Sequence, residues 1–241
     1  MPHRPCRLRR VLVAAPLVLL AACSGIDAAT GPRASRSRAM MLAHDPILFV
    51  HGWNASESTW RTMVARFRAD GWTGAELATW SYRTSQSNAT TALQIKAKVD
   101  SIIAATGAER VDIISHSMGS LSARYYVRNL GGAAKVDAWV SLGGTNYGTT
   151  TAYICSSTAC KEMWPGSNFI TALNSGDDSP GGPRYATWRS PCDEVIIPAR
   201  NAQLLDGANN VETRCIKHSQ LHEDAGVYAQ VREWARPTAS S

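Results

Sequence analysis

The stretch VDIISHSMGS, residues 111–120, decides the fold. A run of mostly β-branched apolar residues ends abruptly at Ser117, which has one small residue two positions before it and another two positions after it (Ser115, Gly119). A helix-like segment, 120–130, follows at once. This is the strand–turn–helix order of a nucleophile elbow, in which a sharp turn lifts one serine clear of a sheet. The pattern makes Ser117 the candidate nucleophile.

The small residues on either side of Ser117 have a packing explanation. Strand and helix backbones nearly touch at such an elbow, so a large side chain at 115 or 119 would clash. Ser115 stands where the usual pattern has glycine, and a hydroxymethyl group is small enough to fit. The alternative is an ordinary strand-to-helix turn, because short strings of this kind also occur in serine-rich loops.

Strand-like and helix-like segments alternate on both sides of the elbow. The strand-like runs are 46–50, 75–82, 110–116, 136–142, 194–197 and 211–216, and apolar helical faces mark 60–67, 92–103, 120–130 and 227–234. Residues 152–190 are rich in Gly, Ser, Pro and Trp, which indicates a long loop insertion. Such alternation builds a parallel sheet covered on both faces. We predict an α/β fold, a minimal α/β-hydrolase with a mostly parallel sheet of about six strands.

The N-terminal residues have the composition of an export signal. Residues 1–10 carry four arginines and no acid, and an apolar run of 11–22 follows, too short for a permanent membrane span. The sequence LAAC at 20–23 resembles a bacterial lipobox, so we expect residues 1–22 to be a lipoprotein signal peptide and Cys23 the lipidated mature N-terminus. The alternative is ordinary signal cleavage near the same alanines, which would make the protein secreted rather than anchored in the cell envelope.

The remaining chain divides into a linker and one domain. Residues 24–45 are rich in Ala, Ser, Gly and Arg without apolar periodicity, so we expect a disordered linker. Residues 46–241 are long enough for one catalytic domain with a full core. The signal takes four of the 25 basic residues and none of the 19 acidic ones, so the excess positive charge mostly belongs to it. We therefore expect a monomer with no nucleic-acid partner.

Cysteine usage agrees with export. Once Cys6 and Cys23 are set aside, four cysteines remain, which allow three pairings. Their places in the chain favour a disulfide inside the insertion and another joining two late segments (Cys155–Cys160, Cys192–Cys215). No Cys-x-x-Cys pair is present, so we expect no zinc site and no metal.

A serine nucleophile needs a base, and the base needs an orienting acid. In α/β-hydrolases the chain order is Ser, acid, His, with each residue at the carboxyl end of a strand or in the next loop. His218 directly follows the last strand-like run and fits the base. His222 is the alternative, although a solvent-facing or capping role suits it better. We expect His116 to point away from Ser117 and His51 to be a structural imidazole in its turn.

The acid must lie between Ser117 and His218. Asp193 stands beside the strand-like run 194–197, where Cys192 can hold the loop, and is the first choice. Glu194 is the second choice. The other aspartates of this region have the surroundings of turn residues (Asp177, Asp178, Asp206).

The oxyanion of an acyl-transfer intermediate needs preorganised donors. One is the backbone N–H of Met118, the residue after the nucleophile. The second comes from the loop after the first core strand, where Gly52 allows the backbone to turn and presents the N–H of Trp53.

Together these residues resemble the class 2 lipases, small bacterial secreted triacylglycerol lipases. The resemblance covers roughly 46–235 and rests on FVHG at 49–52, SHSMG at 115–119, the acid at Asp193, and LDGANNV at 205–211 before His218. It implies a carboxylic ester hydrolase acting on acylglycerols, with little or no lid and no cofactor. It also implies Ser117, Asp193 and His218 as the triad, with Trp53 and Met118 as oxyanion donors. The insertion 152–190 would serve as a partial lid or reshape the acyl pocket.

Three other functions remain open from the sequence. A short-chain esterase and an acyltransferase would use the same triad, and a non-catalytic binding protein would use the same scaffold. The expected partners are a lipid or other ester and, through Cys23, a membrane.

Overall fold

A computed structural model of the chain describes residues 44–236. Six strands form one sheet in the order β2-β1-β3-β4-β5-β6, and every neighbouring pair is parallel. The strands are β1 (Ile47–Val50), β2 (Leu77–Thr79), β3 (Val111–His116), β4 (Val136–Leu142), β5 (Arg184–Arg189) and β6 (Asn209–Glu212). The predicted α/β class and the number of strands are therefore confirmed.

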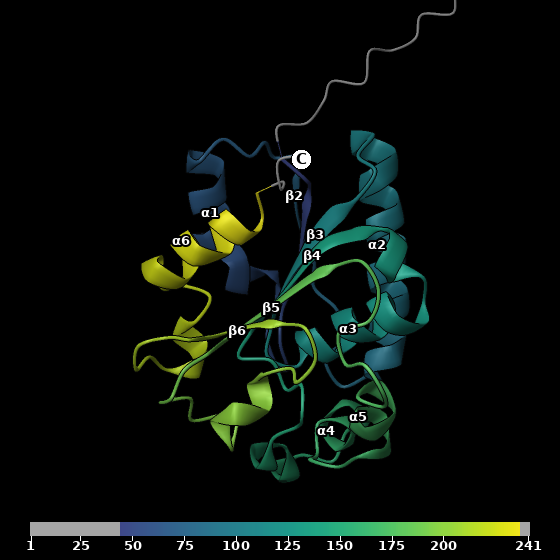
Figure 1. The fold of residues 1–241 in the computed structure, drawn as a ribbon, viewed down its shortest axis with the longest axis vertical. Coiled ribbons are helices and arrows are strands. Elements are labelled where there is room, and N and C mark those ends of the chain that lie inside the picture. The colour runs from purple at the N-terminus through teal and green to yellow at the C-terminus, as the bar shows by residue number, and fades with distance from the viewer. Residues whose placement is uncertain (1–43, 237–241) are drawn as a thin grey trace, which may run out of the picture. The chain divides into compact units, whose positions relative to one another are not determined.

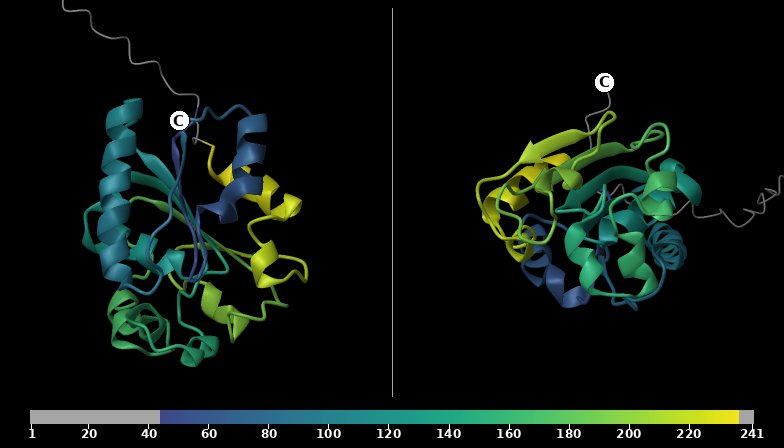
Figure 2. Two further views of the ribbon diagram at one scale, coloured as in Figure 1. Left: turned by 180° about the vertical axis from the view of Figure 1, so that it is seen from behind. Right: turned by 90° about the horizontal axis from the view of Figure 1, so that it is seen from below.

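Helices cover both faces of this sheet, as Figure 1 and Figure 2 show. The α-helices are α1 (Arg61–Ala69), α2 (Asn88–Thr106), α3 (Gly119–Asn129), α4 (Thr158–Glu162), α5 (Asn168–Leu173) and α6 (Ala225–Trp234). Short 3₁₀ segments are η1 (Glu57–Trp60), η2 (Gly132–Ala134), η3 (Thr150–Ile154), η4 (Ala199–Ala202) and η5 (His218–Gln220). In Figure 1, α1 and α6 lie on one face and α2 and α3 on the other. Helices α4 and α5 lie beyond the carboxyl ends of the central strands.

The apolar patterns explain why these elements form. All residues of β1 and β3 are buried, as expected of central parallel strands with helices on both sides. Helix α2 begins where the Ser87 side chain accepts a hydrogen bond from the N–H of Ala89, and it ends at Gly107 with φ 74°. An apolar cluster packs on each face of the sheet. Each fully buried Ile, Leu or Phe in these clusters contributes about 1.5–3 kcal/mol, so the sheet is a rigid base for the loops at its carboxyl end.

The insertion 152–190 is not a long loop, contrary to the sequence prediction. It contains most of η3 and all of α4, α5 and β5, and its apolar side chains pack against Met118 and Leu121. The prediction failed because Gly, Ser and Pro dominate the average composition of a stretch that still holds a short buried strand, YATW at 185–188.

Residues 194–197 form no strand, so this prediction was also wrong. The Oδ1 atom of Asp193 accepts hydrogen bonds from the N–H groups of Val195 and Ile196, which curls the backbone around the carboxylate. Strand β6 is likewise shifted from the predicted 211–216. Near Ile216, the Ser190 hydroxyl takes the place of a strand partner, since it donates to the Ile216 carbonyl and accepts from its N–H.

The predicted signal peptide 1–22, the lipidation site Cys23 and nearly all of the predicted linker lie outside the described residues. The last two linker positions are described, and the His44 ring stacks on Trp72 with 3.7 Å between centroids. Within residues 44–236, no helix is both long enough and apolar enough to cross a membrane.

Candidate active site

Ser117 stands on a sharp turn between β3 and α3. Its φ is 56°, a conformation that non-glycine residues rarely adopt and that marks the strained turn of a nucleophile elbow. A Cβ added at Gly119 would lie 2.4 Å from the carbonyl oxygen of His51 and 2.6 Å from that of Val50. No larger residue fits there, as the small-residue pattern predicts, because α3 starts directly against the end of β1.

The structure also explains why serine stands at position 115. Ser115 is fully buried, and its hydroxyl donates to the Val140 carbonyl at 2.7 Å and lies 3.0 Å from the Ser120 hydroxyl. The Ser141 hydroxyl donates to Ser120 at 2.9 Å. A glycine at 115 would lack this hydrogen bond between β3 and β4, so the serine ties the elbow strand to its neighbour.

Asp193 and His218 form a buried hydrogen-bonded pair. Nδ1 of His218 lies 2.8 Å from Oδ2 of Asp193, and both side chains are almost completely buried. The other carboxylate oxygen is held by the N–H groups of Val195 and Ile196, at 2.9 and 2.8 Å. These bonds fix the carboxylate, which in turn fixes the imidazole and leaves its Nε2 without a protein partner among the described residues.

The two alternative residues occupy different positions. Among the described residues, Glu194 forms no hydrogen bond with the imidazole: its carboxylate accepts from the backbone N–H of His218 at 3.1 Å, so it holds the segment that carries the histidine. His222 is buried rather than facing solvent, contrary to prediction, and its ring contacts those of His116 and Trp60. His218 lies on η5 and does not follow β6 directly, because five residues separate them.

His116 is a site residue that the sequence did not predict. Its ring packs on that of His218 with 4.5 Å between centroids, and its Nε2 lies 3.1 Å from the carbonyl oxygen of His218. Burial, followed by the neighbouring imidazoles, holds the pKa of His116 well below its usual value, so this ring stays neutral. Adjacency to Ser117 was its only signal in the sequence, and that signal does not reveal a contact with η5.

The loop after β1 lies against Ser117. A Cβ added at Gly52 would be 2.8 Å from the Cβ of Ser117 and 3.3 Å from its Oγ. This close approach brings the following residue, Trp53, beside the elbow. Within the described part of the chain, the N–H groups of Trp53 and Met118 donate to no protein group. Both amides are therefore free to bind a ligand oxygen.

His51, at the start of this loop, is structural as predicted. It is fully buried, its Nδ1 lies 2.9 Å from the Gly52 carbonyl oxygen, and its ring stacks on Tyr82. The Tyr82 hydroxyl in turn donates to the His51 carbonyl, which fixes the loop from the outside.

Ser117 and His218 open onto one cavity of about 440 Å³, the size of a small-molecule site. Apolar side chains form much of its wall (Trp53, Ala152, Ile154, Met163, Val195). No hydrogen bond joins Ser117 to His218 among residues 44–236. Such bonds are often long in ligand-free sites and shorten when substrate is bound.

Both predicted disulfides are present, Cys155–Cys160 and Cys192–Cys215. Cys192–Cys215 joins the loop of Asp193 to the segment that leads to His218, so it ties the two halves of the hydrogen-bonded pair together. Cys155–Cys160 closes a short loop at the cavity wall. Disulfides of this kind are typical of exported proteins.

Loss of Cys192–Cys215 should cost more stability than loss of Cys155–Cys160. The sequence separations are 23 and 5, for which chain entropy gives about 3.5 and about 2 kcal/mol. We expect the paired Cys→Ser variant at 192 and 215 to lower Tm by about 7–14 °C and also to lower kcat. The matched pair at 155 and 160 should lower Tm less and leave kcat nearly unchanged. Equal losses of Tm in the two variants, measured by calorimetry, would contradict this prediction.

Comparison with known proteins identifies a family and a fold. The family model described as lipase (class 2) matches residues 44–232. The crystal structure of the mature Bacillus licheniformis lipase BlEst2 superposes with a TM-score of 0.71 at 16% identity, over 81% of this chain and 93% of that one. Aspergillus fumigatus lipase B superposes with a TM-score of 0.68 at 14% identity, over 78% of this chain and 51% of that one. At these identities the two structures show a shared fold.

Proposed function

This chain belongs to the class 2 lipase family and is a lipase-like carboxylic ester hydrolase, and from this premise we propose that Ser117, His218 and Asp193 are its catalytic triad. The observation that carries the proposal is the buried Asp193–His218 pair, which opens onto the same cavity as a serine held at positive φ. A serine hydroxyl, an orienting carboxylate and an imidazole, in this chain order, are what acyl transfer to serine requires.

The proposed reaction has two halves. Nε2 of His218 takes the Ser117 proton while Oγ attacks the ester carbonyl carbon, and the N–H groups of Trp53 and Met118 bind the resulting oxyanion. When the C–O bond breaks, the alcohol leaves with the proton from His218. Water then attacks the acyl-enzyme, His218 takes its proton and returns it to Ser117, and the carboxylic acid is released. Asp193 holds the imidazole in the tautomer that makes Nε2 the acceptor and stabilises the imidazolium.

We infer that acylglycerols are the substrates. The apolar wall of the cavity suits an acyl chain, and several apolar side chains are exposed at or near its mouth (Trp53, Tyr153, Ile154). Ile154 is 83% exposed, a costly arrangement in water that becomes favourable when the mouth lies on a lipid surface.

An acyl-chain series on p-nitrophenyl esters and triacylglycerols tests this substrate class. Each CH₂ that enters the cavity contributes about 0.8 kcal/mol, so kcat/KM should rise about fourfold per CH₂ until the cavity is full. The rate should also rise when the substrate passes its solubility limit. Ile154→Ser should lower the rate on emulsions and leave that on soluble esters unchanged. A preference for acetate with no rise at the solubility limit would identify an esterase, and products that depend on an added alcohol would identify an acyltransferase.

We propose further that the protein is exported as a lipoprotein, with Cys23 as its acylated N-terminus. Support comes from the LAAC sequence at 20–23 and from the two disulfides, which form in oxidising compartments. Acyl chains on Cys23 would hold the enzyme on membranes at about 0.8 kcal/mol per buried CH₂. Mass spectrometry of the mature N-terminus should show an acylated Cys23, and Cys23→Ser should release the enzyme with unchanged kcat. An unmodified Cys23, or a first residue beyond it, would make the protein an ordinary secreted enzyme.

A further inference from the structure

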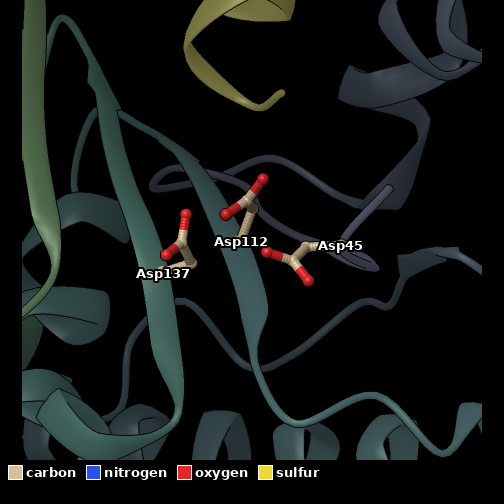
Figure 3. A group of neighbouring side chains, drawn as sticks. All are labelled: Asp45, Asp112 and Asp137. Carbon is tan, nitrogen blue, oxygen red and sulfur yellow. The ribbon is translucent and has the colours of Figure 1, made fainter. Parts of the chain in front are cut away.

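Three carboxylates converge at the end of the sheet opposite Ser117. Asp45 precedes β1, Asp112 is the second residue of β3, and Asp137 is the second residue of β4. Because β1, β3 and β4 are adjacent and parallel, their amino ends meet at one place, and Figure 3 shows the three side chains directed toward one another there. One oxygen from each carboxylate lies within 4.8 Å of the others.

The carboxylate of Asp112 is fully buried and only half satisfied. Its Oδ1 accepts a hydrogen bond from the N–H of Ala138 at 2.9 Å. Its Oδ2 has no hydrogen-bond partner among the described residues, and Figure 3 shows the Asp112 side chain directed toward the other two carboxylates. A buried carboxylate oxygen without a partner is strongly unfavourable, so this atom calls for a ligand that the protein does not itself supply.

The nearby arginines do not supply a partner for this oxygen of Asp112. Arg184 donates to Oδ2 of Asp137 at 2.6 Å, and Arg110 lies 3.5 Å from Oδ1 of the same carboxylate. Among residues 44–236, neither Asp45 nor Asp112 forms an ion pair. Two cations therefore face three carboxylates, and both of them contact Asp137.

A second group of three aspartates shows what a self-sufficient cluster looks like. Asp178 is as deeply buried as Asp112 and lies beside Asp177 and Asp206. Its Oδ1 accepts from the N–H of Asp206, and its Oδ2 accepts from the N–H of Leu205 and from the Tyr147 hydroxyl. Every buried oxygen of Asp178 has a protein donor, so nothing there requires a bound ion.

We propose that Asp45, Asp112 and Asp137 bind a Ca²⁺ ion that stabilises the amino end of the sheet. All three ligands are carboxylate oxygens, which hard cations prefer. Two ligands on one ion lie at most twice the metal–oxygen distance apart, about 4.8 Å for Ca²⁺ and about 4.2 Å for Mg²⁺. The three oxygens lie within the limit for Ca²⁺, and Ca²⁺ tolerates irregular geometry, whereas Mg²⁺ demands a near-ideal octahedron. Arg184 holds Oδ2 of Asp137, and Oδ1, which has only the longer 3.5 Å contact with Arg110, is the oxygen that remains for the ion. Water completes the six to eight ligands.

Without a bound cation, the three carboxylates should lower the stability of the protein. Burial, and then the charges of Asp45 and Asp137, raise the pKa of Asp112 well above its usual range. Ionisation of Asp112 above its unfolded-state pKa therefore costs stability without the cation. A Ca²⁺ ion bound to the three carboxylates would offset this cost, so it should raise Tm.

The test is calcium binding to the purified full chain at pH 7.5. Isothermal titration of the EGTA-treated protein should show one Ca²⁺ site, and Ca²⁺ at about a hundred times its Kd should raise Tm by about 5 °C or more. Asp112→Asn should abolish both effects. Asp45→Asn leaves the Ala138 hydrogen bond and the Arg184 ion pair intact and should raise Kd at least tenfold. Asp177→Asn, in the self-sufficient cluster, is the matched control and should leave Kd unchanged.

Absence of Ca²⁺ binding at millimolar concentration would overturn the proposal and leave Asp112 as a carboxyl that is simply protonated. The proposal would also fail if binding survived in both Asp45→Asn and Asp112→Asn, or if Asp177→Asn removed it. Ca²⁺ titration does not involve the ester-hydrolase reaction, so these results are independent of the triad.

Discussion

Ser117→Ala is expected to lower kcat by about 10⁴-fold or more while the protein stays folded. Triad members act as a unit, so removal of the nucleophile removes nearly all of the catalysis that the set provides. Ser117 is only 8% exposed, but its Oγ makes no hydrogen bond to another side chain among the described residues. Substitution by alanine should therefore cost little stability. The Cβ that contacts the Gly52 loop is retained.

The matched control for this variant is Ser219→Ala. Ser219 lines the same cavity next to His218, but lies outside the proposed triad. The Ser219→Ala variant should keep kcat within a few-fold of the wild-type value. A fluorophosphonate should label the wild type at Ser117 and leave Ser117→Ala unlabelled, with Tm of both variants within about 2 °C of the wild type. If Ser117→Ala kept more than a tenth of the activity, Ser117 would not be the nucleophile.

His218→Ala should lower kcat by a similar factor. The neighbouring histidine, His222, provides the contrast. His218 bonds to Asp193 at 2.8 Å, whereas Nδ1 of His222 has no partner among the described residues and its ring packs against Trp60. Substitution of His222 therefore removes packing and not proton transfer. We expect His222→Gln to lower kcat less than tenfold, with its main effect on Tm.

The pH–rate profile separates these two variants further. His222→Gln should retain the wild-type pH profile of kcat/KM, because it leaves the proposed base in place. His218→Ala should lose nearly all activity across the same pH range. If His222→Gln were the inactive variant and His218→Ala retained normal turnover, the base would have to be reassigned to His222. Asp193→Asn should also lose activity, since an amide in place of the carboxylate stabilises the wrong imidazole tautomer.

Local patterns of the sequence determined the elbow, the order of the proposed triad and the α/β class. The turn at Ser117 depends on a β-branched run and small residues within ten positions, and such short-range sterics can be read directly. The pairing of the four cysteines followed from their places in the chain, and the structure contains both disulfides. Each of these features arises from residues close in sequence or from a fixed chain order.

Tertiary structure alone decided what depends on neighbours distant in sequence. Strand β5 was missed because a six-residue strand with arginine at both ends has no distinctive periodicity, and it forms by pairing between β4 and β6. The contact of His116 with His218 joins residues 102 positions apart. The convergence of Asp45, Asp112 and Asp137 arises only when three parallel strands come into register. Hydrophobic patterning specifies which residues are buried, but the partner of each buried polar group is set by the packing of the whole sheet.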